Sequence, residues 1–329
     1  MNCPKISVLI PTYNYARFLP EAIESVLAQD FRDFELLVVD DCSTDDTVSV
    51  VQPYVSRDPR VQLVVNSRNL GMVNNWNQCL ERAQGEHIKF LFGDDKLFHR
   101  QALSKMLGLL YKYPSAVLAS SARTILDEQS NAIDVYRDLK EGYHDGRKII
   151  MDCLNQNGKN LVGEPSAVLF RKMDGQRGFD AKYSQITDVE MWFHLLEKGG
   201  LAYTREALCA FRCHPSQQTE RNTASGLAQL EHAVFFSTYA VQPWVEPKVV
   251  FPILFHLRRS LRKNSNPPDT SAFEAERRLA SRLREGSRWY DYWVYCIRYL
   301  VTKPFRNLAH SVQKRLFRWS VRGNGKMGS

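Results

Sequence analysis

Two adjacent carboxylates, Asp94 and Asp95, follow the apolar run 88–92 after a single glycine. Mg²⁺ and Mn²⁺ prefer oxygen ligands, and proteins commonly share these cations between one or two carboxylates and the phosphates of a substrate. Aspartates in such a position can also form a turn or cap a helix, because their side chains accept hydrogen bonds from backbone N–H groups. The surrounding elements therefore decide whether this pair belongs to a site for a divalent cation and a diphosphate.

Short apolar runs alternate with segments of helical period along the first 120 residues, which is typical of a parallel sheet with crossover helices. The predicted strands are 6–10, 34–39, 61–65 and 87–92, and the predicted helices between them are 18–29, 47–54 and 72–83. A further helix is predicted over 101–113, where Pro114 ends it, and a strand over 116–120. The pattern predicts an α/β fold.

Each of the first four predicted strands is followed by polar residues. They are Pro11, Thr12 and Tyr13 after the first strand, Asp40 and Asp41 after the second, Arg68 after the third, and Asp94 and Asp95 after the fourth. Ligands of open α/β sheets bind beyond the carboxyl ends of the strands, so these residues should meet at one edge. One such group could be only a turn, but four together favour a binding site that holds an aromatic ring, carboxylates and a cation.

Several common nucleotide and hydrolase motifs are absent from the sequence. No Gly-x-Gly-x-x-Gly follows the first predicted strand, and the chain contains neither a phosphate-binding Gly-x-x-x-x-Gly-Lys-Ser/Thr loop nor a Gly-x-Ser-x-Gly elbow. Dinucleotide oxidoreductases, P-loop enzymes and α/β-hydrolases are therefore disfavoured. What the pattern favours is a nucleotide site built on carboxylates at the edge of a sheet.

The composition, with 44% hydrophobic and 24% charged residues among 329, is typical of a soluble globular protein. Seven cysteines form no disulfide framework, and no signal peptide precedes the first strand, so a reducing cytoplasm is expected. Cys209, Cys213 and His214 match no common zinc-binding spacing.

The charge is divided unevenly along the chain. Residues 248–329 hold 18 Lys and Arg against 5 Asp and Glu, whereas residues 1–247 hold 26 against 31. A basic tail favours an anionic partner, either nucleic acid or a membrane surface, although a solvated helical face would look the same. Aromatic residues and arginines recur in it at helical spacing, and no uncharged run approaches the ~18–20 residues that span a bilayer.

Five segments resemble, in the same order, the motifs of family 2 of the inverting nucleotide-sugar glycosyltransferases. They are residues 8–14, 34–47, 69–71, 85–95 and 188–192, and the resemblance covers about residues 5–220. It implies a GT-A-type fold, with a Rossmann-like, mostly parallel sheet flanked by helices. The catalytic domain would span 1–240, with a nucleotide-binding half over about 1–120 and an acceptor half over about 121–240. The basic, aromatic helical tail, 241–329, would follow it.

The resemblance also implies roles in donor binding for residues of the first half. Pro11, Thr12 and Tyr13 would line the nucleotide pocket, and Asp41 would meet the base. A tyrosine ring can stack on a base, and a carboxylate can accept a hydrogen bond from a ring N–H. Many relatives carry an arginine where this chain has Trp76, so Arg68 is the candidate cation for the phosphates.

Further matches concern the metal ion, Mg²⁺ or Mn²⁺, that the resemblance implies. Asp94 matches the position that meets the ribose, and Asp95 matches the metal ligand. His214, in the segment 211–214, resembles a late histidine that approaches the metal or the diphosphate. A lone histidine is also common as a solvated or capping residue, and its place in the order of motifs favours the functional interpretation.

Asp188 matches the general base of the family, which takes the proton of the acceptor hydroxyl. At the start of a helix predicted over 188–198 it could equally be a capping residue. Glu164, in the segment 163–166, and Trp192 are the candidates for contact with the sugar or the acceptor. Thr187 stands where many relatives have a glutamate, so a second carboxylate is missing there.

The expected function is therefore inverting transfer of a sugar, UDP-linked, to a hydroxyl of a glycan or a lipid-linked glycan in polysaccharide or cell-envelope biosynthesis. Two alternatives stay open: a sugar-nucleotide nucleotidyltransferase, although its glycine-rich basic signature is absent after residues 6–10, and a non-catalytic protein that binds nucleic acid through the tail. The expected location is cytoplasmic and peripheral on the inner face of the plasma membrane. Residues 270–329 would contact anionic lipid, or pack on the catalytic domain or a second copy of the chain.

Overall fold

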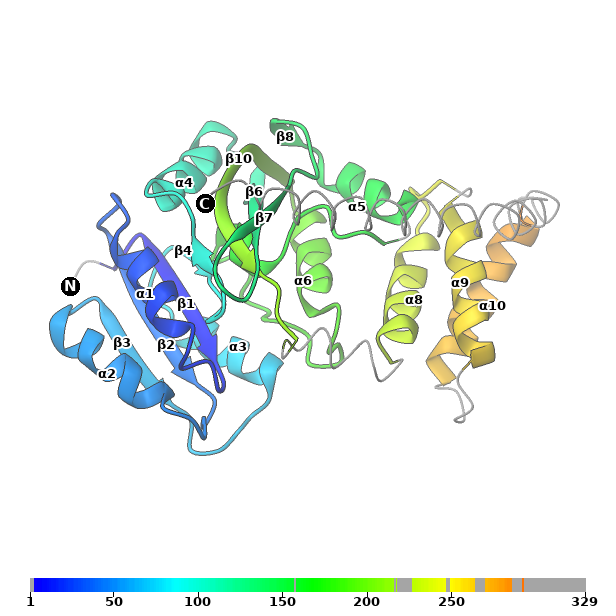
Figure 1. Ribbon diagram of the computed structural model, residues 1–329. Coiled ribbons are helices and arrows are strands. Elements are labelled where there is room, and N and C mark those ends of the chain that lie inside the picture. Colours follow the sequence, from blue (N-terminus) through cyan, green and yellow to red (C-terminus); the bar gives the residue numbers. More distant parts are fainter. Residues whose placement is uncertain are drawn as a thin grey trace, which may run out of the picture. The chain divides into compact units, whose positions relative to one another are not determined.

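Four predicted strands form one half of the central sheet in the computed structural model (Figure 1). They are β1 (Ile6–Thr12), β2 (Phe34–Asp40), β3 (Val61–Val65) and β4 (His87–Phe90), which pair in parallel in the order β3-β2-β1-β4. Every residue of β1, β2 and β4 is buried. Continuous apolar runs are expected of parallel strands that helices cover on both faces.

The structure describes residues 3–156, 158–215, 217, 227–246, 249–263, 270–285 and 292. The chain divides into two units, Met1–Phe235 and Phe236–Ser329. The first unit contains the sheet, and the second contains all of the predicted tail, 241–329.

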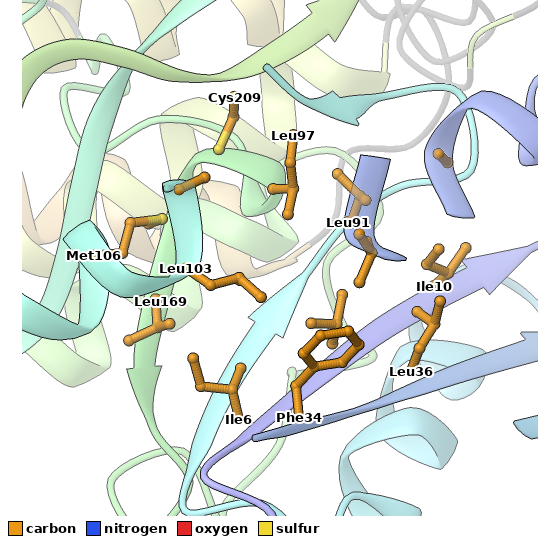
Figure 2. Close-up of a cluster of buried hydrophobic side chains, with 14 of the residues drawn as sticks. Ile6, Ile10, Phe34, Leu36, Leu91, Leu97, Leu103, Met106, Leu169 and Cys209 are labelled. Carbon is orange, nitrogen blue, oxygen red and sulfur yellow. The ribbon is translucent and has the colours of Figure 1, made fainter. Parts of the chain in front are cut away.

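Helices α1 (Leu19–Leu27), α2 (Thr47–Arg57), α3 (Met72–Arg82) and α4 (Ala102–Lys112) connect or follow these strands, close to the predicted bounds. On one face of the sheet, apolar side chains of α1 and α4 join alternate residues of β1 and β2 in a buried cluster (Figure 2). Helix α3 lies against β1 and β2, and its Trp76, outside that cluster, packs against Phe90 of β4 with ring centroids 6.3 Å apart. The helical and strand periods read from the sequence thus agree with the packing.

The second half of the sheet is mixed rather than parallel. It contains β5 (Lys96–Leu97), β6 (Ala116–Leu126), β9 (Val168–Arg171) and β10 (Gly200–Arg212), in the order β4-β9-β6-β10-β5, with β7 (Ala132–Tyr136) beside β6 and β8 (Gly142–His144) beside β10. Strand β9 is antiparallel to both of its neighbours, and β6 and β10 are parallel. The α/β fold with helices flanking a central sheet is confirmed, but the parallel arrangement describes chiefly the first half.

Three further elements of the first unit position the polar residues described below. They are α5 (Gly146–Asn155), the 3-10 helix η1 (Pro165–Ala167) and α6 (Thr187–Leu196). Helix α6 begins one residue before the predicted start, so Asp188 lies in its first turn. Strand β6 runs to Leu126, beyond the predicted 116–120, because β7 pairs with its final residues. Helix α8 (Leu227–Ala240) follows.

Two helices of the second unit, α9 (Val250–Lys263) and α10 (Thr270–Glu285), pack against each other. Leu254, Leu257, Leu279 and Leu283 are fully buried, and Arg258 forms an ion pair with Glu276 at 2.7 Å. The helical tail is therefore observed over these ranges, while the predicted aromatic stripe at Trp289 and Trp293 lies outside the described residues. Within the described part of the chain, no helix has both the length and the apolar character needed to cross a bilayer.

The packing of β2 generates a stability prediction. Val38 is fully buried in the cluster of Figure 2, whereas Val65 on β3 is 49% exposed. Val38→Ala should lower the free energy of unfolding by about 2 kcal/mol, through lost burial and the cavity left behind. Val65→Ala is the matched control and should cost less than about 0.5 kcal/mol. Urea unfolding followed by fluorescence measures both, and equal losses would contradict the assigned packing.

Candidate active site

The carboxyl ends of β1, β2 and β4 meet at one edge of the sheet, as predicted from the strand order. The backbone N–H of Asp41 donates to the carbonyl of Thr12 at 2.9 Å, which joins the ends of β1 and β2. A Cβ on Gly93 would lie 3.3 Å from Thr12 Oγ1 and 3.2 Å from the side chain of Leu19. The turn that carries Asp94 and Asp95 therefore packs closely against the end of β1.

The Asp41 carboxylate is buried and is already engaged with the segment after β3. It accepts hydrogen bonds from Asn66 Nδ2 at 2.9 Å and from the backbone N–H groups of Leu70 and Gly71 at 2.8 and 2.9 Å. Asn75, on α3, in turn accepts from Asn66 at 2.9 Å. Asp41 thus holds residues 66–71 against the sheet, and its predicted contact with a base would add to these bonds.

Tyr13 and Arg68 are exposed at the same edge, whereas Pro11 and Thr12 are buried. The ring of Tyr13 is 41% exposed, which leaves its surface available for stacking. Asn14, with a φ of 58°, joins the loops after β1 and β2, because it donates through its N–H to Ser43 Oγ and accepts from the N–H of Thr44 at 2.8 Å each. The two loops that flank the predicted nucleotide pocket are therefore held to each other.

Asp94, Asp95 and His214 come together from distant parts of the chain. His214 Nε2 lies 3.1 Å from Asp94 Oδ2, with both side chains buried. Asp95 Oδ1 accepts the backbone N–H of Arg212 at 2.9 Å, while Asp95 Oδ2 is buried without a partner at hydrogen-bond geometry among the described residues. Burial, with the neighbouring charge of Asp94, raises the pKa of Asp95 well above its usual range. The nearby Ser166 hydroxyl and the N–H of Arg212 favour the ionised form of Asp95.

A buried carboxylate oxygen without a partner is costly unless a cation neutralises it. The described residues contain no cluster of three His, Cys, Asp or Glu side chains that would enclose a metal by themselves. Mg²⁺ and Mn²⁺ do not need such a cluster, since they take further ligands from substrate phosphates and water. The buried Oδ2 of Asp95 therefore fits a cation that arrives with a diphosphate.

Arg212, which the sequence analysis did not single out, organises this side of the site. Its side chain is 1% exposed. Its guanidinium donates to the carbonyl of Asp94 at 2.7 Å, to Ser130 Oγ at 2.7 Å and to Glu21 at 2.5 Å. It thereby joins the Asp94 turn to α1 and to the turn between β6 and β7. Its position in the segment 211–214 was the available signal, but a sequence does not show which partners a buried arginine meets.

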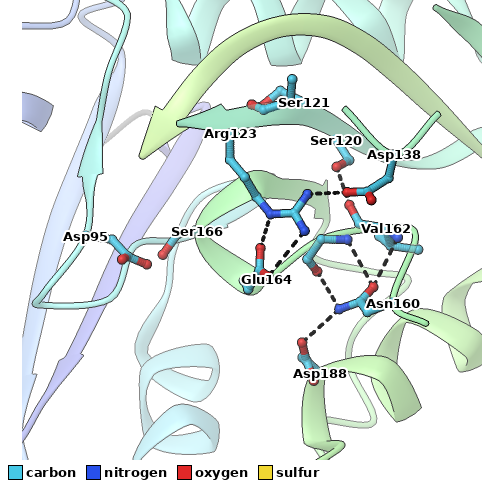
Figure 3. Close-up of polar contacts among 12 residues, drawn as sticks. Asp95, Ser120, Ser121, Arg123, Asp138, Asn160, Val162, Glu164, Ser166 and Asp188 are labelled. Carbon is cyan, nitrogen blue, oxygen red and sulfur yellow. Dashed lines mark hydrogen bonds and ion pairs between the residues drawn. The ribbon is translucent and has the colours of Figure 1, made fainter. Parts of the chain in front are cut away.

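Asp188 lies across the site, in the first turn of α6, and keeps partial access to solvent (Figure 3). Its Oδ2 accepts a hydrogen bond from Asn160 Nδ2 at 3.1 Å. Burial raises the pKa of Asp188 to about 7, and the charge of Glu164 adds to the rise, whereas the backbone N–H of Val189 and the charge of Arg123 oppose it. A carboxyl group with this pKa can exchange protons near neutral pH.

Glu164 is held by a chain of ion pairs that the sequence analysis also missed. Arg123, on β6, forms an ion pair with Glu164 and a second with Asp138 at 2.6 Å (Figure 3). Lys159 lies 2.6 Å from the other oxygen of Asp138. Arg123 is buried, so its charge must be paired. No motif marks these residues, because their partners lie up to 41 positions away in sequence.

The position of Trp192 corrects the expectation that it contacts a sugar or an acceptor. The residue is 1% exposed and packs against Phe170, with ring centroids 6.0 Å apart. Its indole N–H donates to the carbonyl of Gly163 at 3.0 Å. Gly163 has a φ of 107°, in the region that favours glycine. Trp192 therefore supports the segment that carries Glu164.

Residues 163–166 join the two sides of the site. The carbonyl of Gly163 accepts from Asn160 and Trp192, and three residues further on Ser166 Oγ accepts the backbone N–H of Phe92 at 3.0 Å. The buried ammonium of Lys89 donates to the carbonyl of Ser166. Figure 3 shows the Ser166 side chain beside Asp95. The carboxylates Asp95 and Asp188 are thus positioned from opposite ends of one short segment.

A cavity of about 490 Å³ lies elsewhere, at the amino ends of β1 and β4. Its basic side chains are engaged: Lys5 pairs with Glu86 at 2.5 Å, Arg171 donates to the carbonyl of Ala116 at 2.6 Å, and Lys172 donates to the carbonyl of Ala83. The predicted site residues are at the carboxyl ends, so this cavity is separate from them.

Comparison with known proteins identifies the family of the chain. The model of the family described as Glycosyl transferase family 2 matches residues 7–174. The GalNAc(5)-diNAcBac-PP-undecaprenol beta-1,3-glucosyltransferase of Campylobacter jejuni is 44% identical over 95 residues, which are 29% of this chain and 31% of the relative.

Two solved structures share the fold. S. aureus TarS 1-349 in complex with UDP-GlcNAc aligns with a TM-score of 0.60 and 18% identity, over 85% of this chain and 81% of TarS. The mannosyltransferase PcManGT from Pyrobaculum calidifontis, in complex with GDP-Man and Mn²⁺, aligns with a TM-score of 0.55 and 18% identity, over 100% of this chain and 89% of its own. At these identities the likeness concerns the fold.

The raised pKa of Asp188 generates a prediction about stability and pH. Between the ordinary value of 3.8 and about 7, the folded state binds a proton that the unfolded state has lost, so Asp188 lowers the stability progressively as the pH rises through this range. Asp188→Asn removes the ionisable group and, with it, this pH-dependent loss of stability. The free energy of unfolding of the variant relative to wild type should therefore rise between pH 5 and pH 8, by no more than about 2 kcal/mol because Asp188 keeps solvent access. The melting temperature should rise with it.

The exposed Asp33 provides the matched control. Asp33→Asn should leave the melting temperature within error of wild type at both pH values. If the difference in melting temperature between Asp188→Asn and wild type does not increase from pH 5 to pH 8, the assigned burial of Asp188 is refuted.

Proposed function

The chain belongs to glycosyl transferase family 2 and is a glycosyltransferase, and we propose that it moves a hexose from a nucleoside-diphosphate sugar to an acceptor hydroxyl with inversion. One observation carries the proposal: residues 163–166 are bonded at one end to Phe92, just before the turn with Asp95, and at the other end to Asn160, which donates to Asp188. Asp95 is suited to a cation, and Asp188 is suited to proton exchange. The first suits the departing diphosphate, and the second suits the incoming alcohol.

The proposed donor is a UDP-sugar. The UDP-GlcNAc in the TarS structure supports this donor. PcManGT was determined with GDP-Man, and the panel of nucleotides described below distinguishes the two. The exposed ring of Tyr13 would stack on the base, with Asp41 as the hydrogen-bond acceptor of a ring N–H. Arg68, exposed after β3, would contact the phosphates.

Mg²⁺ or Mn²⁺ would be held by Asp95 with support from His214, and Asp94 would meet the ribose. The buried, unpartnered Oδ2 of Asp95 supports this assignment, as does the Mn²⁺ in the PcManGT complex. Such an ion, when bound, supplies Lewis-acid stabilisation of the charge that develops on the departing nucleoside diphosphate. The guanidinium of Arg212 donates to the carbonyl of Asp94, and its backbone N–H donates to Asp95 Oδ1, so Arg212 helps to fix the direction of the Asp95 carboxylate.

Asp188 would act as the general base. The acceptor oxygen forms a bond to the anomeric carbon as the bond from that carbon to the diphosphate oxygen breaks, and the electron pair of the broken bond leaves with the diphosphate. The proton of the acceptor hydroxyl passes to Asp188. A pKa of about 7 suits this step, because a base is most effective when its pKa is near the working pH. Attack opposite the leaving group inverts the anomeric carbon.

Glu164 would bind hydroxyl groups of the sugar, held in place by Arg123. The proposed acceptor is a glycan, or a glycan carried on a lipid diphosphate in polysaccharide or cell-envelope biosynthesis. The name of the Campylobacter jejuni relative, which specifies an undecaprenol diphosphate acceptor, supports the lipid-linked form.

Substitutions of Asp95 and of Asp188 should affect different steps, donor binding in the first case and turnover in the second. Asp95→Ala should abolish the Mn²⁺-dependent part of the rise in melting temperature that a nucleoside diphosphate or nucleotide sugar produces. Asp188→Asn should keep that rise and lower turnover by about 10²- to 10⁴-fold, because only the proton acceptor is removed. Thermal shifts across a panel of nucleotides, followed by chromatography of the released product, measure both effects.

Asp33→Asn serves again as the control and should keep both properties. Full turnover in either site variant would refute the corresponding assignment. Release of pyrophosphate instead of a nucleoside diphosphate would favour a sugar-nucleotide nucleotidyltransferase.

We also propose that the second unit contacts an anionic membrane surface. Phe273 and Arg277 lie four positions apart on α10 and are exposed, and so is Arg278. Replacing both arginines by glutamate should release the protein from vesicles containing phosphatidylglycerol in a flotation assay, since each basic residue near such a surface contributes about 1 kcal/mol. Unchanged flotation, or no flotation of the wild type, would reject the membrane contact and favour packing within the protein.

A further inference from the structure

Asn160, between α5 and η1, has an amide whose four hydrogen bonds are all made within the protein. Its Oδ1 accepts the backbone N–H groups of Val162 and Gly163, both at 3.0 Å. Its Nδ2 donates to the carbonyl of Gly163 at 3.0 Å and to Asp188 Oδ2 at 3.1 Å. Asn160 itself is marked by no motif and did not figure among the predicted site residues.

The direction of this amide is fixed by chemistry. If the oxygen and the nitrogen exchanged places, the NH₂ group would face two N–H donors and the oxygen would face a carbonyl and a carboxylate. Both contacts would be repulsive. Asn160 therefore presents a donor, and not an acceptor, to Asp188.

We infer that Asn160 is a positioning residue that occupies Oδ2 of Asp188 and so makes Oδ1 the oxygen that takes the proton of the acceptor hydroxyl. A proton on Oδ2 would compete with the N–H of Asn160 for the same side of the carboxyl group, whereas a proton on Oδ1 leaves that hydrogen bond intact. The inference rests on the proposed function, because it assigns the reacting atom of the base named there. The acceptor hydroxyl must then approach Asp188 from the side of Oδ1.

The same contacts join the base to the sugar-binding side of the site. Asn160 is bonded to both backbone polar groups of Gly163, and the next residue is Glu164. The charged groups near Asp188 are Glu164, which raises its pKa, and Arg123, which lowers it, while the backbone N–H groups of Val189 and Asp188 also lower it. The Asn160 hydrogen bond acts together with these groups by stabilising the ionised form.

Two variants at this position test the inference. Asn160→Ala removes the donor and the acceptor together. Asn160→Asp is nearly isosteric, keeps an oxygen for the N–H groups of Val162 and Gly163, and replaces only the donor. Carboxyl ¹³C NMR titration of Asp188 should show a rise in its pKa of about one pH unit in Asn160→Ala, and a larger rise in Asn160→Asp, where a second carboxyl group lies beside it.

The pH dependence of turnover, measured with the donor that the nucleotide panel selects, is the second readout. Its acidic limb should move upwards by the same amount as the NMR titration, with little change in the KM for the donor. A residue with a purely structural role would lower turnover at all pH values and leave the limb in place. Asn131→Ala is the matched control, since Asn131 donates to another carboxylate, Asp127, at 2.9 Å. It should leave the titration of Asp188 unchanged.

An unshifted Asp188 titration in both folded Asn160 variants would overturn the inference and leave the proposed function standing. Full turnover by Asp188→Asn would overturn the proposed function, and the catalytic role of Asn160 with it. Because the NMR titration needs no substrate, the two failures are distinguishable.

Discussion

The site depends on hydrogen bonds that hold residues 163–166 at both ends. Gly163 accepts from the side chains of Asn160 and Trp192, while Ser166 is bonded to the backbone of Phe92 and to the ammonium of Lys89. Three peptide steps span at most about 11 Å, so the contacts made at the two ends of this segment stay close to each other.

The charged side chains at the proposed reacting positions differ in their pairing from the charged side chains around them. Arg123, Asp138 and Arg212 are buried, but each has charged partners at hydrogen-bond distance. Asp95 retains a buried oxygen without a partner, and the pKa of Asp188 is raised to about 7 by burial. Uncompensated carboxylates destabilise a fold, and they are commonly kept where ligand binding or chemistry uses them. The contrast between paired and unpaired charges separates the supporting residues from the reacting ones.

The sequence predicts best those features that depend on local pattern. Strands β1 and β2 are continuous apolar runs, α1 and α3 have clear helical periods, and the segment 188–192 places Asp188 near the start of a helix. The antiparallel β9 and the two-residue β5 carry no comparable pattern, because their pairing is decided by neighbours far along the chain. The same reason explains why Asn160, Arg123 and Arg212 were not predicted: the salt bridge of Arg212 with Glu21 spans 191 positions. Trp192 was misassigned because a sequence shows the presence of a ring but not its burial.

We propose that a cation bound near Asp95 would face the same pocket as the carboxyl group of Asp188. Paramagnetic broadening of the Asp188 carboxyl ¹³C resonance by Mn²⁺, in the presence of a nucleoside diphosphate, tests this arrangement because the effect falls steeply with distance. We expect strong broadening in the wild type and its disappearance in Asp95→Ala. An Asp188 resonance that stays sharp while Mn²⁺ and the nucleotide are bound would show that the two groups do not share a pocket.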